Sequence, residues 1–327
     1  MIEKSNVLLT GATGFVGNAV LMSLLGCKRG TLSVRAAVRV SSTKISCTSY
    51  VIGDMAAATD WSDALFNQSV VIHCAARAHI MKDEVADPLT EYRKVNVDGT
   101  LNLARQAAEA GVRRFIFLSS IKVNGESTNI DQLFTPADKP APEDPYGQSK
   151  LEAEQGLLAL AEETGMEVVI IRPPLVYGPG VKGNFASLIK LAQKNLPLPL
   201  GAVDNRRSLV ALDNLVDLII TCIDHPAAAN QTFLVSDDHD LSTAQLLREL
   251  TLAAGKSPRL LPFPPVLLKT AATLLGKRAV ADRLLGSLQV DITHTRETLN
   301  WTPPVKVQDG LKRCFECFEC SIFSLLC

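Results

Sequence analysis

The sequence predicts an α/β fold built on a doubly wound parallel sheet, with a smaller C-terminal lobe partly interleaved with it. Three observations lead to this prediction. Short apolar runs rich in β-branched residues alternate with helix-like segments through the first half of the chain. A glycine-rich loop separates the first of these runs from the first helical segment. After Arg172 the alternation gives way to loops punctuated by proline. Strands that alternate with helices in this way are typical of βαβ units, whose parallel sheet carries helices on both faces.

Six apolar runs are expected to form the strands of the sheet. They span residues 6–10, 33–38, 49–52, 70–74, 114–119 and 167–172. The clearest helical patterns lie at 88–110 and 146–164, with a further one at 243–254. Right-handed crossovers between such strands give a doubly wound sheet, and ligands of these sheets bind at the carboxyl ends of the strands.

Composition and charge exclude several classes of protein. Of the 327 residues, 47% are hydrophobic and 20% are charged, so the chain can bury a large core and is not disordered. The 33 basic and 34 acidic side chains give a net charge of -1, which provides no overall field to attract DNA or an acidic membrane. We therefore expect no nucleic-acid partner. Neither a targeting segment nor a run of about 20 apolar residues is visible, so we expect no membrane span and a cytoplasmic location.

The loop after the first strand carries the pattern of a dinucleotide site. Residues 11–17 read Gly-Ala-Thr-Gly-Phe-Val-Gly and lead directly into a helical segment. Glycine permits a tight turn, a close approach of backbone to a pyrophosphate and close helix–strand packing, and the first N–H groups of a helix attract phosphate. An ordinary glycine-rich turn is the alternative, which the strand–loop–helix order disfavours. We predict a Rossmann-like cofactor site that includes Gly11, Thr13, Gly14, Phe15, Val16 and Gly17.

The end of the second strand bears on which dinucleotide binds. An acidic residue at this place bonds the ribose hydroxyls of NAD. Here the strand ends with Val38 and Arg39, without a carboxylate, and Arg39 can pair with the 2′-phosphate of NADP. Both NADP and NAD stay open, and Arg39 favours NADP. The alternative for Arg39 is a solvated surface arginine.

A serine, a tyrosine and a lysine form the candidate catalytic set. Ser120 follows the apolar run 115–118, at the carboxyl end of a strand. Tyr146 and Lys150 stand four residues apart in a helical segment, so they share one helix face. A nearby ammonium favours the phenolate of Tyr146, and Ser120 can stabilise charge on a substrate oxygen. The set suits proton transfer to or from an alcohol while a hydride moves to or from a nicotinamide.

In combination these motifs resemble the extended short-chain dehydrogenase/reductases of the NAD(P)-dependent nucleotide-sugar epimerase/dehydratase family, which includes UDP-glucose 4-epimerases. The resemblance covers roughly residues 5 to 313. The motifs that carry it, in order, are residues 10–17, Gly53-Asp54-Met55, His73-Cys74-Ala75-Ala76, residues 96–100, Ser119-Ser120, residues 146–150 and residues 172–179.

The resemblance implies roles along the cofactor. Asp54 bonds the adenine amino group and Met55 flanks the ring. Tyr146 is the acid/base, and Lys150 binds the ribose as well as tuning Tyr146. Further cofactor-binding residues are Cys74, Ala75 and Ala76 after the fourth strand, Pro173 near the nicotinamide, and Asn96 in the helix behind the site, where a structural role is favoured.

A substrate side follows from the same resemblance. Asn184 and Arg207 match residues that contact the diphosphate of a nucleotide sugar, and Arg283 is a candidate second clamp because guanidinium groups suit phosphate oxygens. Helix capping by Asn184 and a surface charge at Arg283 are the alternatives. Lys122 stands where epimerases often carry a small hydroxyl residue, so it is included among the substrate-binding candidates.

The chemistry expected is that of an NAD(P)-dependent oxidoreductase acting at C4 of a UDP-hexose or UDP-N-acetylhexose. A 4-epimerase and a 4-keto reductase both stay open. Residues 123–125, Val-Asn-Gly, depart from the usual Val-Tyr-Gly and are similar to a polysaccharide subset that includes UDP-N-acetylquinovosamine-type 4-keto reductases. A non-catalytic dinucleotide sensor is the alternative from another class. Family members suggest a homodimer through the helices that start near Leu89 and Tyr146.

The chain is expected to divide into three parts. Residues 1–172 form mainly the dinucleotide-binding domain, to which later segments return, and residues 173–313 form mainly the substrate-binding lobe. Residues 314–327 are an atypical tail, in which the spacing of Cys314, Cys317, Cys320 and Cys327 differs from a ferredoxin run. The five histidines show no ligand spacing, so we expect no metal site.

Overall fold

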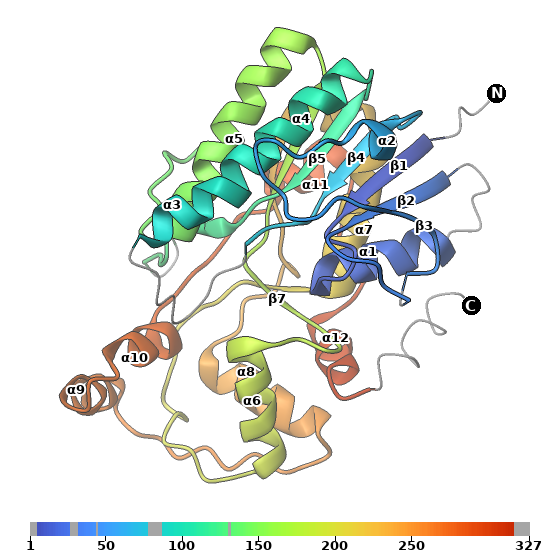
Figure 1. Ribbon diagram of the computed structural model, residues 1–327. Helices are drawn as coiled ribbons and strands as arrows, with labels where there is room; N and C mark the ends of the chain where they lie inside the picture. The colour runs from blue at the N-terminus through green and yellow to red at the C-terminus, as the bar shows by residue number, and fades with distance from the viewer. Residues whose placement is uncertain (1–4, 27–31, 44, 78–86, 130–131, 317–327) are drawn as a thin grey trace.

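The computed structural model describes residues 5–26, 32–43, 45–77, 87–129 and 132–316 (Figure 1). Within these residues a seven-stranded parallel sheet has the strand order β3-β2-β1-β4-β5-β6-β9. Its strands are β1 (Ser5–Thr10), β2 (Leu32–Val38), β3 (Thr48–Val51), β4 (Val70–His73), β5 (Arg114–Leu118), β6 (Glu167–Arg172) and β9 (Gln231–Leu234). The direction of winding reverses between β1 and β4, which places the ligand crevice of a doubly wound sheet at their carboxyl ends.

The predicted fold class is confirmed, and each of the six predicted strands is present to within one residue at either end. The edge strand β9 was not predicted. Its four residues begin with the polar pair Gln231 and Thr232, so the run lacks the apolar signature of the inner strands. The expected helix at 88–110 is divided into α3 (Pro88–Arg93), a π-helical segment η1 (Lys94–Gly99) and α4 (Thr100–Glu109).

Helices cover both faces of the sheet. One face carries α1 (Phe15–Gly26), α7 (Leu212–Asp224) and α11 (Thr293–Leu299). The opposite face carries α2 (Ser62–Leu65), α4 and α5 (Pro145–Thr164), with α3 packed on α5. Because successive strand residues point to opposite faces, Val7 and Leu9 of β1 lie in the first layer and Leu8 in the second.

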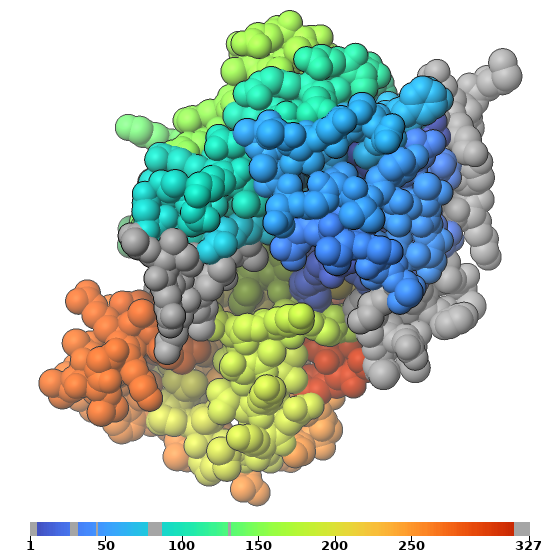
Figure 2. Space-filling view, viewed as in Figure 1, coloured from blue at the N-terminus to red at the C-terminus, as the bar shows by residue number. Residues whose placement is uncertain are grey.

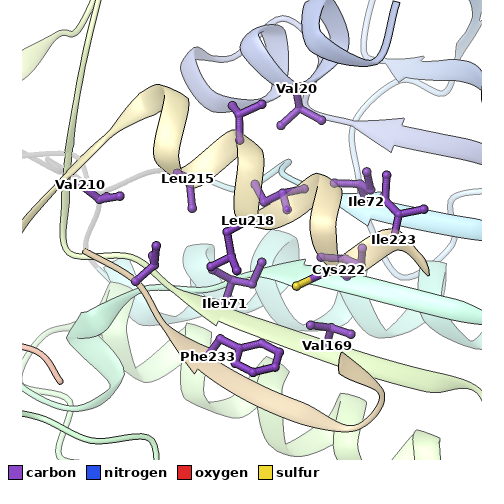
Figure 3. Packing of buried hydrophobic residues seen from close by; sticks show 14 of the residues in the cluster. Val20, Ile72, Val169, Ile171, Val210, Leu215, Leu218, Cys222, Ile223 and Phe233 are labelled. Carbon is purple, nitrogen blue, oxygen red and sulfur yellow. The ribbon is translucent and has the colours of Figure 1, made fainter. Parts of the chain in front are cut away.

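Segments beyond residue 172 return to the sheet. β9 pairs with β6, and α7 packs beside α1. Figure 3 shows side chains of α7, including Leu215, Leu218 and Cys222, packed among those of the sheet and of α1. The layer on this face is therefore assembled from both halves of the chain.

The rest of the second half forms a lobe beyond the carboxyl ends of the strands (Figures 1 and 2). A third apolar cluster holds it together, with Tyr177 and Phe185 stacked at 5.3 Å between ring centroids. No helix among the described residues is long and apolar enough to cross a membrane. The elements of the lobe are β7 (Leu175–Tyr177), β8 (Leu209–Ala211), α6 (Gly183–Lys194), α8 (Thr243–Ala253), α9 (Pro265–Leu274), α10 (Arg278–Leu285) and α12 (Val307–Arg313), and two 3-10 turns elsewhere are η2 (Ile121–Val123) and η3 (Pro226–Ala228).

The start of α1 lies unusually close to the turn that follows β1. A Cβ atom on Gly17 would stand 2.2 Å from the carbonyl oxygen of Gly11, which is backbone and cannot move aside cheaply. Gly11 itself has a φ of +73°, and a Cβ there would stand 2.7 Å from the backbone nitrogen of Ala75. Glycine at both positions lets α1, β1 and the end of β4 meet.

We expect Gly17→Ala to lower the free energy of unfolding by about 3 kcal/mol, since the added methyl overpacks a rigid backbone contact. Urea titration measures the change. Gly111→Ala is the matched control, because Gly111 has a φ of +78° with nothing within 4 Å of the added Cβ. That control carries only the left-handed backbone cost of about 1–2 kcal/mol. A Gly17→Ala protein as stable as Gly111→Ala contradicts the close packing.

Candidate functional site

The glycine loop and the end of β4 together form a cradle at the place where the sequence predicts a dinucleotide. The Gly14 N–H donates to the Gly11 carbonyl at 2.8 Å, which closes the turn directly before α1 begins at Phe15. Thr13 and Gly14 are exposed, and Phe15 and Val16 are half-buried. The close approach of Gly11 to Cys74 and Ala75 leaves no room for a side chain at Gly11. The structure therefore brings the predicted loop residues together with Cys74, Ala75 and Ala76, which are half-buried beside it.

A second part of the predicted cofactor site lies just beyond the carboxyl ends of β2 and β3. A pocket of about 280 Å³ is lined by Arg39, Val40, Gly53 and Asp54. The guanidinium of Arg39 lies 3.9 Å from the carboxylate of Asp54, and both side chains are largely exposed. Met55 does not line this pocket, because its side chain is buried against Gly99 in the second apolar cluster.

A buried histidine joins the carboxyl ends of the two central strands. His73, at the end of β4, lies between Thr10 Oγ1 (2.7 Å from Nδ1) and Thr100 Oγ1 (3.0 Å from Nε2). Burial lowers the pKa of His73 to about 3, with a smaller contribution from Lys150. The imidazole is therefore neutral at ordinary pH and acts as a hydrogen-bonding tie. Sequence reasoning excluded His73 as a metal ligand but did not identify this role.

Asn96 ties the loop after β4 to α5. Its amide nitrogen donates to the Arg77 carbonyl at 3.2 Å and to Ser149 Oγ at 3.0 Å, and its amide oxygen accepts from the Arg77 N–H at 2.8 Å. The side chain is fully buried in η1. Through these bonds Asn96 has a structural role: it holds the backbone of Arg77 against Ser149, the residue before Lys150.

The predicted catalytic residues gather where β5 ends and α5 begins. Ser120 caps η2, with its Oγ accepting from the Lys122 N–H at 3.3 Å. Tyr146 and Lys150 lie one turn apart on α5, and the Lys150 ammonium stands 6.0 Å from the Tyr146 ring centroid. Lys150 Nζ donates to the carbonyl of Leu118 at 2.9 Å. The approach of α5 to η2 is close, since a Cβ on Gly147 would stand 2.8 Å from the Lys122 carbonyl oxygen.

Burial shifts the proton affinities of this set. It lowers the pKa of Lys150 to about 8, against the opposing pull of Glu154 and Cys74. It raises the pKa of Tyr146 well above its usual value, and Asp144 and Tyr92 raise it further. The pKa of the Cys74 thiol rises to about 12 on burial, so this thiol is inert. Tyr146 is consequently a phenol at neutral pH, and a positive charge beside it is needed to make it a base.

A buried ion pair lies behind these residues. Arg172, at the end of β6, meets Glu154 of α5 with a shortest distance of 2.5 Å, and both side chains are almost fully buried. Glu154 also accepts from Ser119 Oγ, and Arg172 Nη1 donates to Asn124 Oδ1 at 3.0 Å. The sequence carried no signal for this network, since no spacing rule links a mid-helix glutamate to a strand-end arginine.

Pro173 follows this network directly. It is buried, and its carbonyl accepts from the Ile121 N–H at 3.0 Å. The chain after β6 is thereby held against the start of η2, one residue from Ser120.

Lys122 is engaged with protein carboxylates. Its ammonium donates to Glu126 and to Asp144 at 2.6 Å each. Burial alone would lower the pKa of Lys122, but the bonds to these two carboxylates raise it above its usual value. Asp144 also caps α5 through the Gly147 N–H at 2.7 Å. Lys122 thus steadies the helix start that carries Tyr146, and contact with a substrate stays a prediction.

Two of the remaining substrate candidates lie together. Arg207 Nη1 donates to the carbonyls of Arg283 and Gly286 at 2.9 and 3.2 Å, at the C-terminal end of α10. Arg283 itself is exposed on α10. Asn184 is exposed in the first turn of α6, where Lys182 occupies the cap position, so Asn184 is not the helix cap.

The described residues contain no group of three or more His, Cys, Asp or Glu side chains placed to hold a metal ion. Cys314 lies after α12 with its thiol 3.6 Å from the Gly310 carbonyl. The other tail cysteines, Cys317, Cys320 and Cys327, lie outside the described residues.

Comparison with known proteins points to one family. Residues 7–236 match the model of the NAD dependent epimerase/dehydratase family. Over 314 residues, covering 96% of this chain and 95% of the relative, the sequence is 54% identical to UDP-glucose 4-epimerase of Vibrio cholerae.

Solved structures share the fold. UDP-glucose 4-epimerase of Thermotoga maritima with UDP-glucose has a TM-score of 0.75 at 24% identity, over 97% of this chain and 99% of that one. The Thermus thermophilus UDP-glucose 4-epimerase complex with NAD has a TM-score of 0.73 at 23% identity, over 94% and 97%.

We expect the titration of Lys150 to add stability to the protein freed of dinucleotide as the pH rises from about 8 to about 10, relative to a variant that lacks this amine. Lys150 has its pKa lowered to about 8 when folded, whereas an unfolded lysine titrates near ~10.4. The unfolded chain holds the extra proton in this interval, so the contribution of Lys150 to the free energy of unfolding rises with pH, by about 2 kcal/mol in all. The thiols of Cys74, Cys222 and Cys314, whose pKa values burial raises to about 12, act in the opposite direction in the same interval, so the Lys150 contribution is measured as a difference between variants.

Urea titrations at several pH values measure this slope. The free energy of unfolding of the wild type minus that of Lys150→Met is expected to rise by about 2 kcal/mol from pH 8 to pH 10, whereas the difference between the wild type and Lys190→Met, on the exposed surface of α6, stays flat. A difference between the wild type and Lys150→Met that does not rise across the interval contradicts the burial of an ionisable Lys150.

Proposed function

We propose that this chain, which belongs to the NAD dependent epimerase/dehydratase family, is an NAD-dependent UDP-sugar 4-epimerase that inverts the configuration at C4 of a UDP-hexose. The observation that carries the proposal is the placement of Ser120, Tyr146 and Lys150 at one edge of the sheet, beside the glycine cradle. The 54% identity to UDP-glucose 4-epimerase of Vibrio cholerae, over nearly the whole chain, supports UDP-glucose as a substrate.

The cradle fits a dinucleotide. The close backbone packing at Gly11 and Gly17 leaves no room for side chains at these two positions. The pocket beside Arg39 and Asp54 extends the cradle toward the adenine end. The relatives favour NAD, and the preference for NADP drawn from Arg39 is not supported. Because Arg39 shares its surroundings with the Asp54 carboxylate, a 2′-phosphate would meet a like charge there. The chemistry that a bound NAD would supply at this site is the reversible acceptance of a hydride from C4.

Side chains of this protein transfer the proton of the C4 hydroxyl and bind the C4 oxygen. The Tyr146 phenolate accepts the proton of the C4 hydroxyl during oxidation and returns it during reduction. Ser120 donates to the C4 oxygen, where charge develops. The Lys150 ammonium, oriented by the Leu118 carbonyl, stabilises the phenolate and lowers the pKa that burial has raised. The two half-reactions together thus return the protein to its starting protonation state.

The substrate side completes the proposal. Asn184 and Arg207 contact the diphosphate, with Arg283 as a second clamp, and residues 173–313 supply most of this lobe while residues 1–172 hold the dinucleotide. The bond from Arg207 to the Arg283 carbonyl supports a common location for the two arginines. A homodimer through α3 and α5 belongs to the same proposal, and the mass of the protein in solution tests it.

A 4-keto reductase of the UDP-N-acetylquinovosamine type is the second candidate. Two features of the sequence favour this reductase: Val-Asn-Gly at residues 123–125, in place of the usual Val-Tyr-Gly, and the positive charge of Arg39. Asn124 has a structural role that needs no substrate, because its side chain is hydrogen-bonded to Arg172 and to the Thr135 carbonyl in the buried network. A non-catalytic sensor has no use for the assembled catalytic set.

We expect Tyr146→Phe to reduce kcat for interconversion of UDP-glucose and UDP-galactose by about a hundred- to ten-thousand-fold, the range for loss of an acid–base group. Bound dinucleotide stays at the wild-type level, because the ring is retained. Tyr50→Phe removes the same hydroxyl from β3 and leaves turnover unchanged. A Tyr146→Phe protein with the kcat of the wild type contradicts the assignment of Tyr146 as the acid–base group.

We also expect purified protein to interconvert UDP-glucose and UDP-galactose without added nucleotide and to release NAD on denaturation. An epimerase regenerates its cofactor within each cycle, which makes exchange unnecessary. Mass spectrometry of the released nucleotide provides the readout, with UDP-N-acetylglucosamine assayed in parallel. Release of NADP, together with turnover only on a 4-keto sugar plus NADPH, overturns the epimerase in favour of the reductase.

A further inference from the structure

The hairpin of α9 and α10 exposes apolar side chains that no other described element covers. α9 contains no buried residue along its ten positions. The exposed fractions are 74% for Val266, 83% for Leu274 and 73% for Leu275. The hairpin extends from the rest of the molecule at the lower left of Figures 1 and 2. An apolar surface of this kind, rimmed by polar groups, marks an interaction site.

The same hairpin carries local positive charge. Residues 265–285 contain four basic side chains and one acidic one, a local net charge of +3 in a chain whose total is -1. The single acid, Asp282, is shared by Lys269 at 3.0 Å and Arg278 at 3.6 Å. Lys277 in the turn and Arg278 at the start of α10 follow Leu274 and Leu275 closely in the chain. Exposed leucines and cations thus lie side by side at the tip.

We propose that the tip of the α9–α10 hairpin docks on the surface of an anionic phospholipid bilayer. Leucines adjacent to lysine and arginine suit the boundary between acyl chains and acidic headgroups, where the apolar groups insert and the cations remain among the phosphates. At ten and eight residues the helices are far below the about 20 residues of a span, so the hairpin lies at the interface.

A second copy of the chain fits this surface less well. In a two-fold pairing the same patch meets itself, so the net positive charge of one hairpin would be brought against the equal charge of its copy. Like charges placed together at an interface are repulsive, whereas acidic headgroups complement them. The chain's near-neutral total charge is no obstacle, because charge beyond a Debye length of about 8 Å is screened at physiological salt.

The hairpin is joined firmly to the substrate side of the lobe. Arg207 bonds the carbonyls of Arg283 and Gly286, and Asn205 bonds the Gly286 carbonyl at 2.7 Å. A docked hairpin therefore fixes the position of the whole lobe relative to the bilayer. Docking does not depend on the proposed epimerase activity, since none of the tip residues belongs to the catalytic set.

Sedimentation with vesicles tests the proposal. The probes are vesicles of phosphatidylcholine alone and of an equal mixture with phosphatidylglycerol, each in about 0.1 M and about 1 M salt, where the Debye length falls from about 10 Å to about 3 Å. The wild-type protein is expected to sediment with the anionic vesicles at low salt and to be released by high salt or by removal of phosphatidylglycerol. Wild-type protein that stays in the supernatant of the anionic vesicles overturns the proposal.

Paired variants locate the contact. Leu274→Glu with Leu275→Glu is expected to lower the vesicle-bound fraction about tenfold. Phe66→Glu with Leu252→Glu adds the same charge at residues of similar exposure, 66% and 56%, and binds like the wild type. Turnover of UDP-glucose stays unchanged in both, so loss of turnover in every form would count against the epimerase alone. Unaltered vesicle binding by the Leu274/Leu275 variant, or a dimer that this variant dissolves without any vesicle binding, overturns the docking.

Discussion

Glu154 and Arg172 form an ion pair that is almost fully buried between α5 and β6, and four segments of the chain meet on it. Ser119 reaches it from the end of β5, and Asn124 reaches it from the end of η2. Removing one partner leaves an uncompensated charge in the core, at a cost of about 3–5 kcal/mol. The pair thereby determines where Ser120 stands relative to the helix that carries Tyr146 and Lys150.

Burial has the largest effect on the pKa of Lys150, and Glu154 of this pair opposes it. Glu154 favours the charged form of Lys150, while burial disfavours it, and the balance leaves the pKa of Lys150 near neutrality at about 8. Tyr146 remains a phenol until a positive charge stabilises its anion. In the proposed mechanism the Lys150 ammonium, 6.0 Å from the ring centroid of Tyr146, supplies that positive charge. This coupling suits a reaction that removes a proton and later restores it to the same oxygen.

Local sequence patterns predicted those features of the structure that depend on residues close together in the sequence. The glycine loop, six strands and the spacing of Tyr146 and Lys150 follow from turn chemistry and from strand and helix periodicity. Contacts between distant segments were not predictable, because no spacing encodes them. Glu154 with Arg172, Lys122 with Asp144 and His73 with Thr10 are all of this kind. β9 was not predicted because its composition does not indicate a strand. It is a strand because it is buried at the edge of the sheet.

In the proposed reaction, C4 of the sugar loses and regains a hydride without exchange with water. The most direct test uses UDP-glucose carrying deuterium at C4, incubated with the protein in ordinary water and followed by mass spectrometry of the UDP-galactose formed. If a hydride leaves and returns within a closed crevice, the deuterium remains on C4 of the product. Loss of the deuterium to solvent contradicts the account, because it requires a proton to be exchanged at that carbon.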